Sequence, residues 1–122
     1  MKILLIEPPF YRLYDKDYSL HKFPLSLGYL SSIIKEKTNN EVFVYNADFS
    51  IINKEQTHVF LAGKGFENYL HNINDFSYLV WQEVEDVIAR INPQLIGITA
   101  KSQNFKAASK VAEIIKLKFP SI

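Results

Sequence analysis

The side chains that could bind or transform a ligand gather in three short stretches of the sequence. The first is Glu7 to Phe10, where a carboxylate precedes two prolines and an aromatic ring. The second is Pro24 to Gly28, and the third runs from Thr99 to Ser102 and carries two hydroxyl groups. Proline fixes φ and lacks an N–H donor, so the first stretch should be a rigid loop. Hydroxyls beside a helix N-terminus suit a phosphate or an amide-bearing ligand, because free amides and the helix dipole attract such groups there.

Each stretch also has a purely structural interpretation, and the sequence leaves both open. The two prolines could present Phe10 as an apolar lid, or they could simply end a strand. Gly28 inside a helix costs ~1 kcal/mol relative to Ala, so it should serve close approach by a packed strand or by a ligand. Ser102 or Asn104 could cap a helix rather than bind anything.

Several enzyme chemistries lack the residues that they need. The chain has no cysteine, which excludes thiolate nucleophiles, thiolate zinc sites and cysteine-held iron-sulfur clusters. The "GKG" at 63–65 lacks the glycine spacing and the hydroxyl residue of a phosphate-binding P-loop. Neither Ser26 nor Ser102 lies in a G-x-S-x-G motif. The three histidines are far apart and predict no metal site: His21, His58 and His71. No partner residue is placed to tune a base among Glu7, Asp15 and Asp17.

Composition predicts one globular domain that spans residues 1–122. The chain is 48% hydrophobic and carries a net charge of +1, which gives no global field for nucleic acid or an anionic membrane. The first ten residues contain an apolar run too short for a signal peptide, and no segment approaches the ~20 apolar residues of a membrane span. We therefore expect a cytoplasmic protein that binds neither nucleic acid nor membrane.

Strand and helix patterns alternate along the chain. A continuous apolar run at 2–6 predicts a central strand that is covered on both faces, and further strands are expected at 41–48 and 94–100. Helices are expected at 24–37, from Ser77 to Pro93 with Asp75 or Ser77 as a cap, and at 102–119. Residues 49–76 read as an irregular insertion with one short helix. The last helix should turn five residues inward: Phe105, Ala108, Val111, Ala112 and Ile115.

This order predicts an α/β fold with a Rossmann-like (flavodoxin-like) doubly wound parallel sheet in three α/β/α layers. The sequence ends after the third βα unit, where another strand would be due. A three-stranded sheet has vulnerable edges, so we expect a larger module or a sheet completed by another chain, a homodimer through an exposed edge included.

Ligands of open parallel sheets bind beyond the carboxyl ends of the strands. That rim should contain 7–14, 46–48 and 99–104. A dinucleotide site would need glycines after the first strand, and two prolines stand there instead, so Asp48 reads as a turn residue rather than a ribose-binding acid.

Four segments in order resemble a known family: "KILLIEPP", "FPLSLGYLSSIIKE", "EVFVYNAD" and "INPQLIGITAKSQNFKAASKVAEIIKLKFP". They look like the N-terminal cobalamin (B12)-binding domain of B12-dependent radical S-adenosylmethionine (SAM) enzymes, over most of the chain apart from 49–76. The resemblance implies that cobalamin is the cofactor and that the corrin lies against eight residues: Pro8, Pro9, Phe10, Pro24, Leu27, Gly28, Thr99 and Ser102.

The chain departs from related families in informative ways. The D-x-H-x-x-G loop that supplies a cobalt-ligating His in other cobalamin domains is replaced by "EPPFYR". The chain lacks the C-x-x-x-C-x-x-C motif, so it cannot cleave SAM reductively by itself, and we expect that it is not catalytic alone. The resemblance implies a cofactor-holding module for a radical SAM domain, C-terminal to it or in a parent protein, of methyltransferase or cyclase type. The alternative is a small α/β interaction module that binds no cofactor and uses aromatic residues of the insertion region as its partner surface: Phe60, Phe66, Tyr69 and Trp81.

Overall fold

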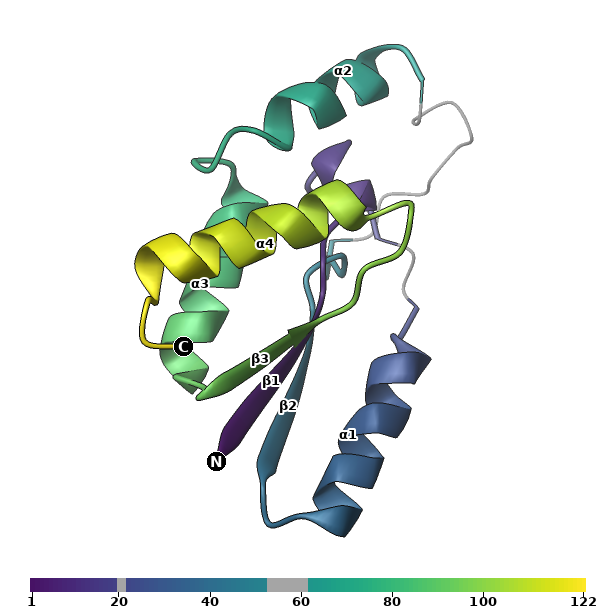
Figure 1. Cartoon of the computed structure of the whole chain (residues 1–122). Helices are drawn as coiled ribbons and strands as arrows, with labels where there is room; N and C mark the ends of the chain where they lie inside the picture. The colour runs from purple at the N-terminus through teal and green to yellow at the C-terminus, as the bar shows by residue number, and fades with distance from the viewer. Residues whose placement is uncertain (20–21, 53–61) are drawn as a thin grey trace.

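A three-stranded parallel sheet forms the centre of the protein (Figure 1). The computed structural model describes residues 1–19, 22–52 and 62–122. Strand β1 (Lys2–Glu7) lies between β2 (Glu41–Asn46) and β3 (Leu95–Ile98), and both pairings are parallel. The predicted central position of the first strand is therefore confirmed. Within the described part of the chain, β2 and β3 each pair only with β1.

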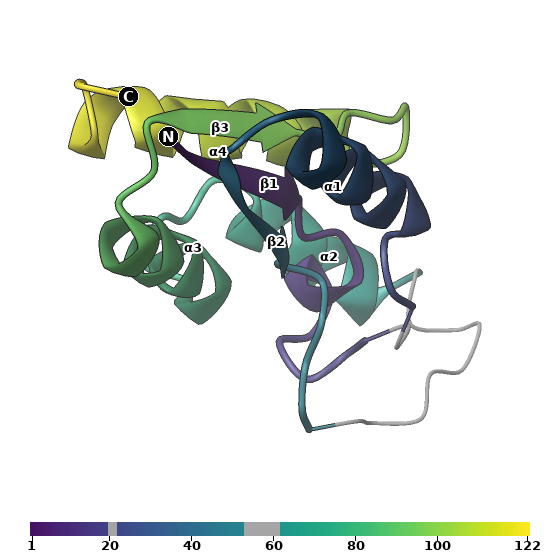
Figure 2. The same ribbon diagram turned by 90° about the horizontal axis from the view of Figure 1, so that it is seen from below.

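The two faces of β1 belong to two separate cores, as its continuous apolar run predicts. Ile3 and Leu5 pack with Leu27 of α1 (Leu25–Lys37) on one face. Leu4 and Ile6 pack with α3 (Leu79–Ile91) and α4 (Phe105–Lys118) on the other. Because side chains alternate along a strand, both faces need an apolar cover. The result is the expected Rossmann-like arrangement, with helices on both sides of an open parallel sheet (Figure 2).

The buried face of α4 differs from the expected one. Ala108, Val111 and Ile115 are buried as predicted, whereas Phe105 is 62% exposed and Ala112 is also exposed. The buried arc is centred on Val111 and takes in Ala107 and Ile114 instead. At 100° per residue, the two misplaced residues lie just beyond one margin of that arc.

The start of α3 also departs from the prediction. Tyr78 occupies the N-cap position and its side chain makes no capping hydrogen bond. Asp75 instead accepts hydrogen bonds from the backbone N–H and the hydroxyl of Ser77, at 3.0 and 2.6 Å, and so shapes the preceding turn. At the other end, Asn92 adopts a left-handed conformation with φ of 49°, and Pro93 follows it. The helix therefore ends where proline predicts.

The insertion contains the short helix that was expected. Helix α2 (Lys64–Asn72) packs against a 3-10 turn, η1 (Tyr11–Leu13), and residues 53–61 lie outside the described part. Asn68 and Asn72 donate side-chain N–H groups to the carbonyls of Tyr14 and Leu13, at 3.2 and 2.9 Å. These bonds fix Leu13 and Tyr14 of the loop after β1 to α2. No helix in the described residues is long and apolar enough to cross a membrane.

Candidate functional site

Four segments that are distant in sequence meet at the carboxyl ends of the strands. They contribute the residues that line one pocket of about 290 Å³: 7–11 at the end of β1, 22–26 at the start of α1, 46–48 at the end of β2, and 101–104 after β3. We call this the rim pocket. Parallel strands direct their carboxyl ends to the same side of a sheet, so the pocket lies where the fold class predicts a ligand.

The "EPPF" stretch forms one wall of the rim pocket and also ends β1. Pro8 and Pro9 are fully buried, and of the two only Pro8 lines the pocket. Phe10 lines it as well, and its ring packs edge-to-face on Tyr11 and Tyr14, with centroids 5.0 and 5.5 Å away. Because these neighbours hold the ring, Phe10 is part of a fixed wall.

Asp48 fixes this loop to the end of β2. Its Oδ1 accepts the backbone N–H groups of Phe10 and Arg12, at 2.8 and 3.1 Å, and its own N–H donates to Asn46 Oδ1. Burial raises the pKa of Asp48 from its ordinary value of 3.8 to about 6, although the N–H groups of Phe10 and Arg12 and the Arg12 charge lower it. Asp48 is a turn residue, as expected. It also fixes η1 to the end of β2, a contact that the sequence analysis did not predict.

Glu7 joins β1 to the loop after β3. Its carboxylate accepts hydrogen bonds from the Thr99 hydroxyl at 2.6 Å, the Lys101 ammonium at 3.0 Å and the Asn104 amide at 3.4 Å. The side chain of Glu7 is only 14% exposed, so these bonds stabilise a carboxylate that is largely removed from water. The hydroxyl of Thr99 donates to Glu7 and not into the pocket. A carboxylate that ends a buried strand was the sequence signal for this network.

The remaining expected residues lie around the rim pocket without lining it. Ser102 is exposed, and neither it nor Asn104 caps α4 through its side chain, since Asn104 Oδ1 accepts the Lys101 N–H. Leu27, on α1, is buried against Ile3 and Leu5 of β1. A Cβ on Gly28 would lie 2.6 Å from a ring carbon of Phe23, so the glycine permits close approach of that ring, which itself lines the pocket. Of the eight expected residues, the pocket brings together three: Pro8, Phe10 and Pro24.

Charges of both signs line the rim pocket. Glu7 and Asp48 are balanced by Lys22 and Lys101, so the pocket favours polar ligands without selecting one sign of charge. Within residues 1–19, 22–52 and 62–122, no three His, Cys, Asp or Glu side chains are grouped so that they could hold a metal ion. His71 lies on α2, and His21 and His58 lie outside the described residues.

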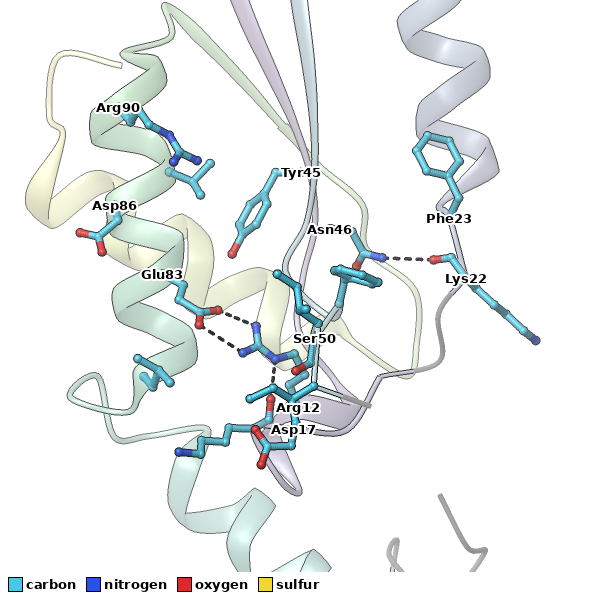
Figure 3. A pocket seen from close by; sticks show the side chains of 16 residues that line it. Arg12, Asp17, Lys22, Phe23, Tyr45, Asn46, Ser50, Glu83, Asp86 and Arg90 are labelled. Carbon is cyan, nitrogen blue, oxygen red and sulfur yellow. Dashed lines mark hydrogen bonds and ion pairs between the residues drawn. The ribbon is translucent and has the colours of Figure 1, made fainter. Parts of the chain in front are cut away.

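A larger cavity of about 870 Å³ lies between β2 and α3 (Figure 3). We call it the β2–α3 cavity. One end is closed by Arg12, which is 5% exposed and binds both carboxylate oxygens of Glu83 through two nitrogens, at 2.6 and 3.2 Å. Arg12 also donates to the carbonyls of Lys16 and Ala47. A buried guanidinium needs such partners, because an unpaired charge away from water is strongly unfavourable.

No protein-family model, curated protein or solved structure matches this chain.

Proposed function

We propose that the chain is a Rossmann-like module that binds cobalamin at the rim pocket. One observation carries the proposal: the loops after all three strands and the start of α1 line a single pocket. Those segments overlap all four of the stretches that carry the family resemblance. The pocket also lies beyond the carboxyl ends of the strands, where open parallel sheets bind ligands.

The composition of the pocket suits a flat ligand with amide groups around its edge. Pro8, Phe23 and Leu25 provide apolar surface for the face of a macrocycle. Carboxylate and amide oxygens accept the N–H groups of the corrin amides, and amide nitrogens and ammonium groups donate to the corrin carbonyls. The polar groups in reach of such an edge are Glu7, Asn46, Asp48, Lys101, Gln103 and Asn104. On this chemistry the residues fit the group.

The size of the pocket limits how the ligand is held. Small-molecule sites range from ~300 to 1,000 Å³, and the rim pocket, at about 290 Å³, is at the lower end. It would therefore hold one part of a macrocycle that rests on the rim, and the rest would stay uncovered by this chain. Cobalamin supplies a cobalt ion that can carry methyl groups. No His of the described residues lines the pocket, so here the chain would hold the corrin through its edge and face.

The role of the chain is then to bind and orient. The network of Glu7 with Thr99 and Lys101 fixes the loop after β3, and Asp48 fixes the loop after β1. Radical formation would belong to a radical SAM domain in the same protein or a parent assembly. The reaction class is methyl transfer or ring formation, as the family resemblance implies.

Spectroscopy with hydroxocobalamin tests the proposal. The protein is incubated with the corrin and desalted, and its visible spectrum is recorded. Ser26 is exposed and lines the rim pocket, so Ser26→Trp should fill part of it. Ser32 is exposed on the same helix and lies outside the pocket, which makes Ser32→Trp the matched control. We expect the wild type and Ser32→Trp to keep the corrin band and Ser26→Trp to lose it. A folded wild type that elutes colourless, or equal retention by both variants, would contradict the proposal.

The alternative, an interaction module with an aromatic partner surface, loses much of that surface. Trp81 is fully buried and Tyr69 belongs to the same core. Phe66 is exposed, and Phe60 lies outside the described residues. Trp81 is held in the core by its Nε1–H, which donates to the Asn72 carbonyl at 2.8 Å. Exposed large apolar side chains also lie outside the insertion region, among them four on α1: Leu25, Tyr29, Leu30 and Ile33.

A further inference from the structure

The β2–α3 cavity is about three times larger than the rim pocket and is not used by the proposed function. Its apolar wall is formed by the ring of Tyr45 on β2 and by Leu79 and Val87 on α3. At 870 Å³ it falls within the range of sites that hold drug-sized molecules. Among the described residues β2 is an edge strand, and the cavity lies beside it.

Two hydroxyl groups in this cavity have no hydrogen-bond partner among the described residues. Ser50 is only 7% exposed, and Tyr45 is half-buried. Buried polar groups are nearly always paired with protein or water, because leaving one unpaired costs ~1–3 kcal/mol. Burial also raises the pKa of Tyr45 to about 12, so its phenol keeps its proton and can donate. These two hydroxyls are therefore available to a ligand.

Beyond the Arg12–Glu83 pair, three cations and two carboxylates line the cavity: Lys16, Lys22 and Arg90, and Asp17 and Asp86. Arg12 is neutralised by Glu83, whereas Arg90 makes no ion pair with a described residue. Figure 3 shows Arg90 and Tyr45 extending into the gap from opposite sides, with the Tyr45 hydroxyl toward Glu83, while Asp86 points away from it. The side chains of Lys16 and Lys22 add two further cations without a carboxylate partner in the described part of the chain. An anionic group is the ligand chemistry that this arrangement favours.

We propose that the β2–α3 cavity binds an amphipathic organic anion, with its apolar body against Leu79, Val87 and the Tyr45 ring and its acidic group at Arg90. The Tyr45 and Ser50 hydroxyls would donate hydrogen bonds to the same molecule. This site is separate from the rim pocket, although Lys22, Phe23 and Asn46 line both. It does not depend on cobalamin binding.

Two fluorescent probes of similar shape test the charge and the apolar wall separately. The first is 8-anilinonaphthalene-1-sulfonate, which has an apolar body and one anionic group. The second is N-phenyl-1-naphthylamine, which lacks the charge. We expect the sulfonate to bind the wild type saturably at one molecule per chain. Arg90→Gln should weaken it about tenfold, the loss of a charge-assisted hydrogen bond. Tyr45→Phe should weaken it severalfold and leave the fold intact, because it removes only a hydroxyl.

The controls decide whether the effect belongs to the cavity. Lys118 is exposed in the last turn of α4, so Lys118→Gln removes the same charge elsewhere and should leave sulfonate binding unchanged. Binding of the uncharged probe should be insensitive to Arg90→Gln. The proposal is overturned if the sulfonate does not bind saturably, if Lys118→Gln weakens it as much as Arg90→Gln, or if neither Arg90→Gln nor Tyr45→Phe changes its affinity. Retention of hydroxocobalamin by Arg90→Gln is measured separately, so failure of one site is distinguishable from failure of the other.

Discussion

Replacing Asp48 by Asn should change how the stability of the protein depends on pH. In the wild type, burial raises the pKa of Asp48 from 3.8 to about 6. Below pH 3.8 the carboxyl is protonated in both the folded and the unfolded state. Between pH 3.8 and 6 the unfolded chain releases its proton first, so the contribution of this group falls as pH rises and is lost above pH 6. A change from 3.8 to about 6 corresponds to about 3 kcal/mol of unfolding free energy.

Asp48→Asn removes this titration and keeps a carbonyl oxygen that can accept the N–H groups of Phe10 and Arg12. Urea unfolding followed by circular dichroism at steps from pH 3.5 to 7.5 gives the unfolding free energy of both proteins. We expect the variant to gain about 3 kcal/mol relative to the wild type between the lowest and the highest pH. Titrations of the other carboxyls are common to both proteins and cancel in the difference.

Asp75 supplies a control with the opposite sign. Hydrogen bonds from Ser77 lower the pKa of this carboxyl, so its contribution is present above pH 3.8 and is lost as pH falls below it. The difference between Asp75→Asn and the wild type should therefore change below pH 4 and stay flat between pH 5 and 7. Parallel stability curves for Asp48→Asn and the wild type would refute the burial argument for Asp48.

Three further substitutions test the packing around the two sites, and the first two can be followed by urea unfolding. Gly97→Ala should lower the free energy of unfolding by about 1–3 kcal/mol, because the new Cβ would lie 2.9 Å from a methyl group of Leu5 in the packed sheet. An unchanged urea midpoint would be inconsistent with that packing. Arg12→Met should lower the free energy of unfolding by about 2–4 kcal/mol, because it leaves Glu83 without its partner. Arg12→Lys should restore little of that loss, since a single ammonium cannot bind both Glu83 oxygens and two carbonyls as the guanidinium does. Full rescue by Lys would show that charge alone matters. Gly28→Ala should leave the free energy of unfolding unchanged or raise it by up to ~1 kcal/mol, because the Phe23 ring is 61% exposed and can move away from the new Cβ. The displaced ring should reduce corrin retention after desalting. Retention equal to that of the wild type would show that Phe23 is not part of the site.

The fold could be predicted largely because its signals are local. The apolar run of β1, the proline before α1 and the Asn92-Pro93 stop of α3 each act within a few residues, and the structure places them as expected. Where the prediction for α4 is wrong, at Phe105 and Ala112, the error concerns the margin of the buried arc. That margin depends on how the helix lies on its neighbours, which a sequence pattern does not specify.

The candidate sites could be predicted only in part, because their contacts join distant segments. The rim was expected from strand ends alone. The network of Glu7 with Thr99 and Lys101 spans more than 90 residues, and the bond from Phe10 to Asp48 spans 38. The sequence analysis did not single out Arg12, and only the position of α3 brings Glu83 to it. The β2–α3 cavity was not expected, because it arises where a helix lies beside an open sheet edge.

Hydrogen exchange with and without hydroxocobalamin tests the central claim most directly, since it reports where on the chain the corrin rests. We predict slower exchange at 10–14, 22–26, 46–48 and 101–104 when the corrin is present, with no change along α3. Unchanged exchange at these segments, or protection confined to α3 and the outer edge of β2, would contradict cobalamin binding at the rim pocket.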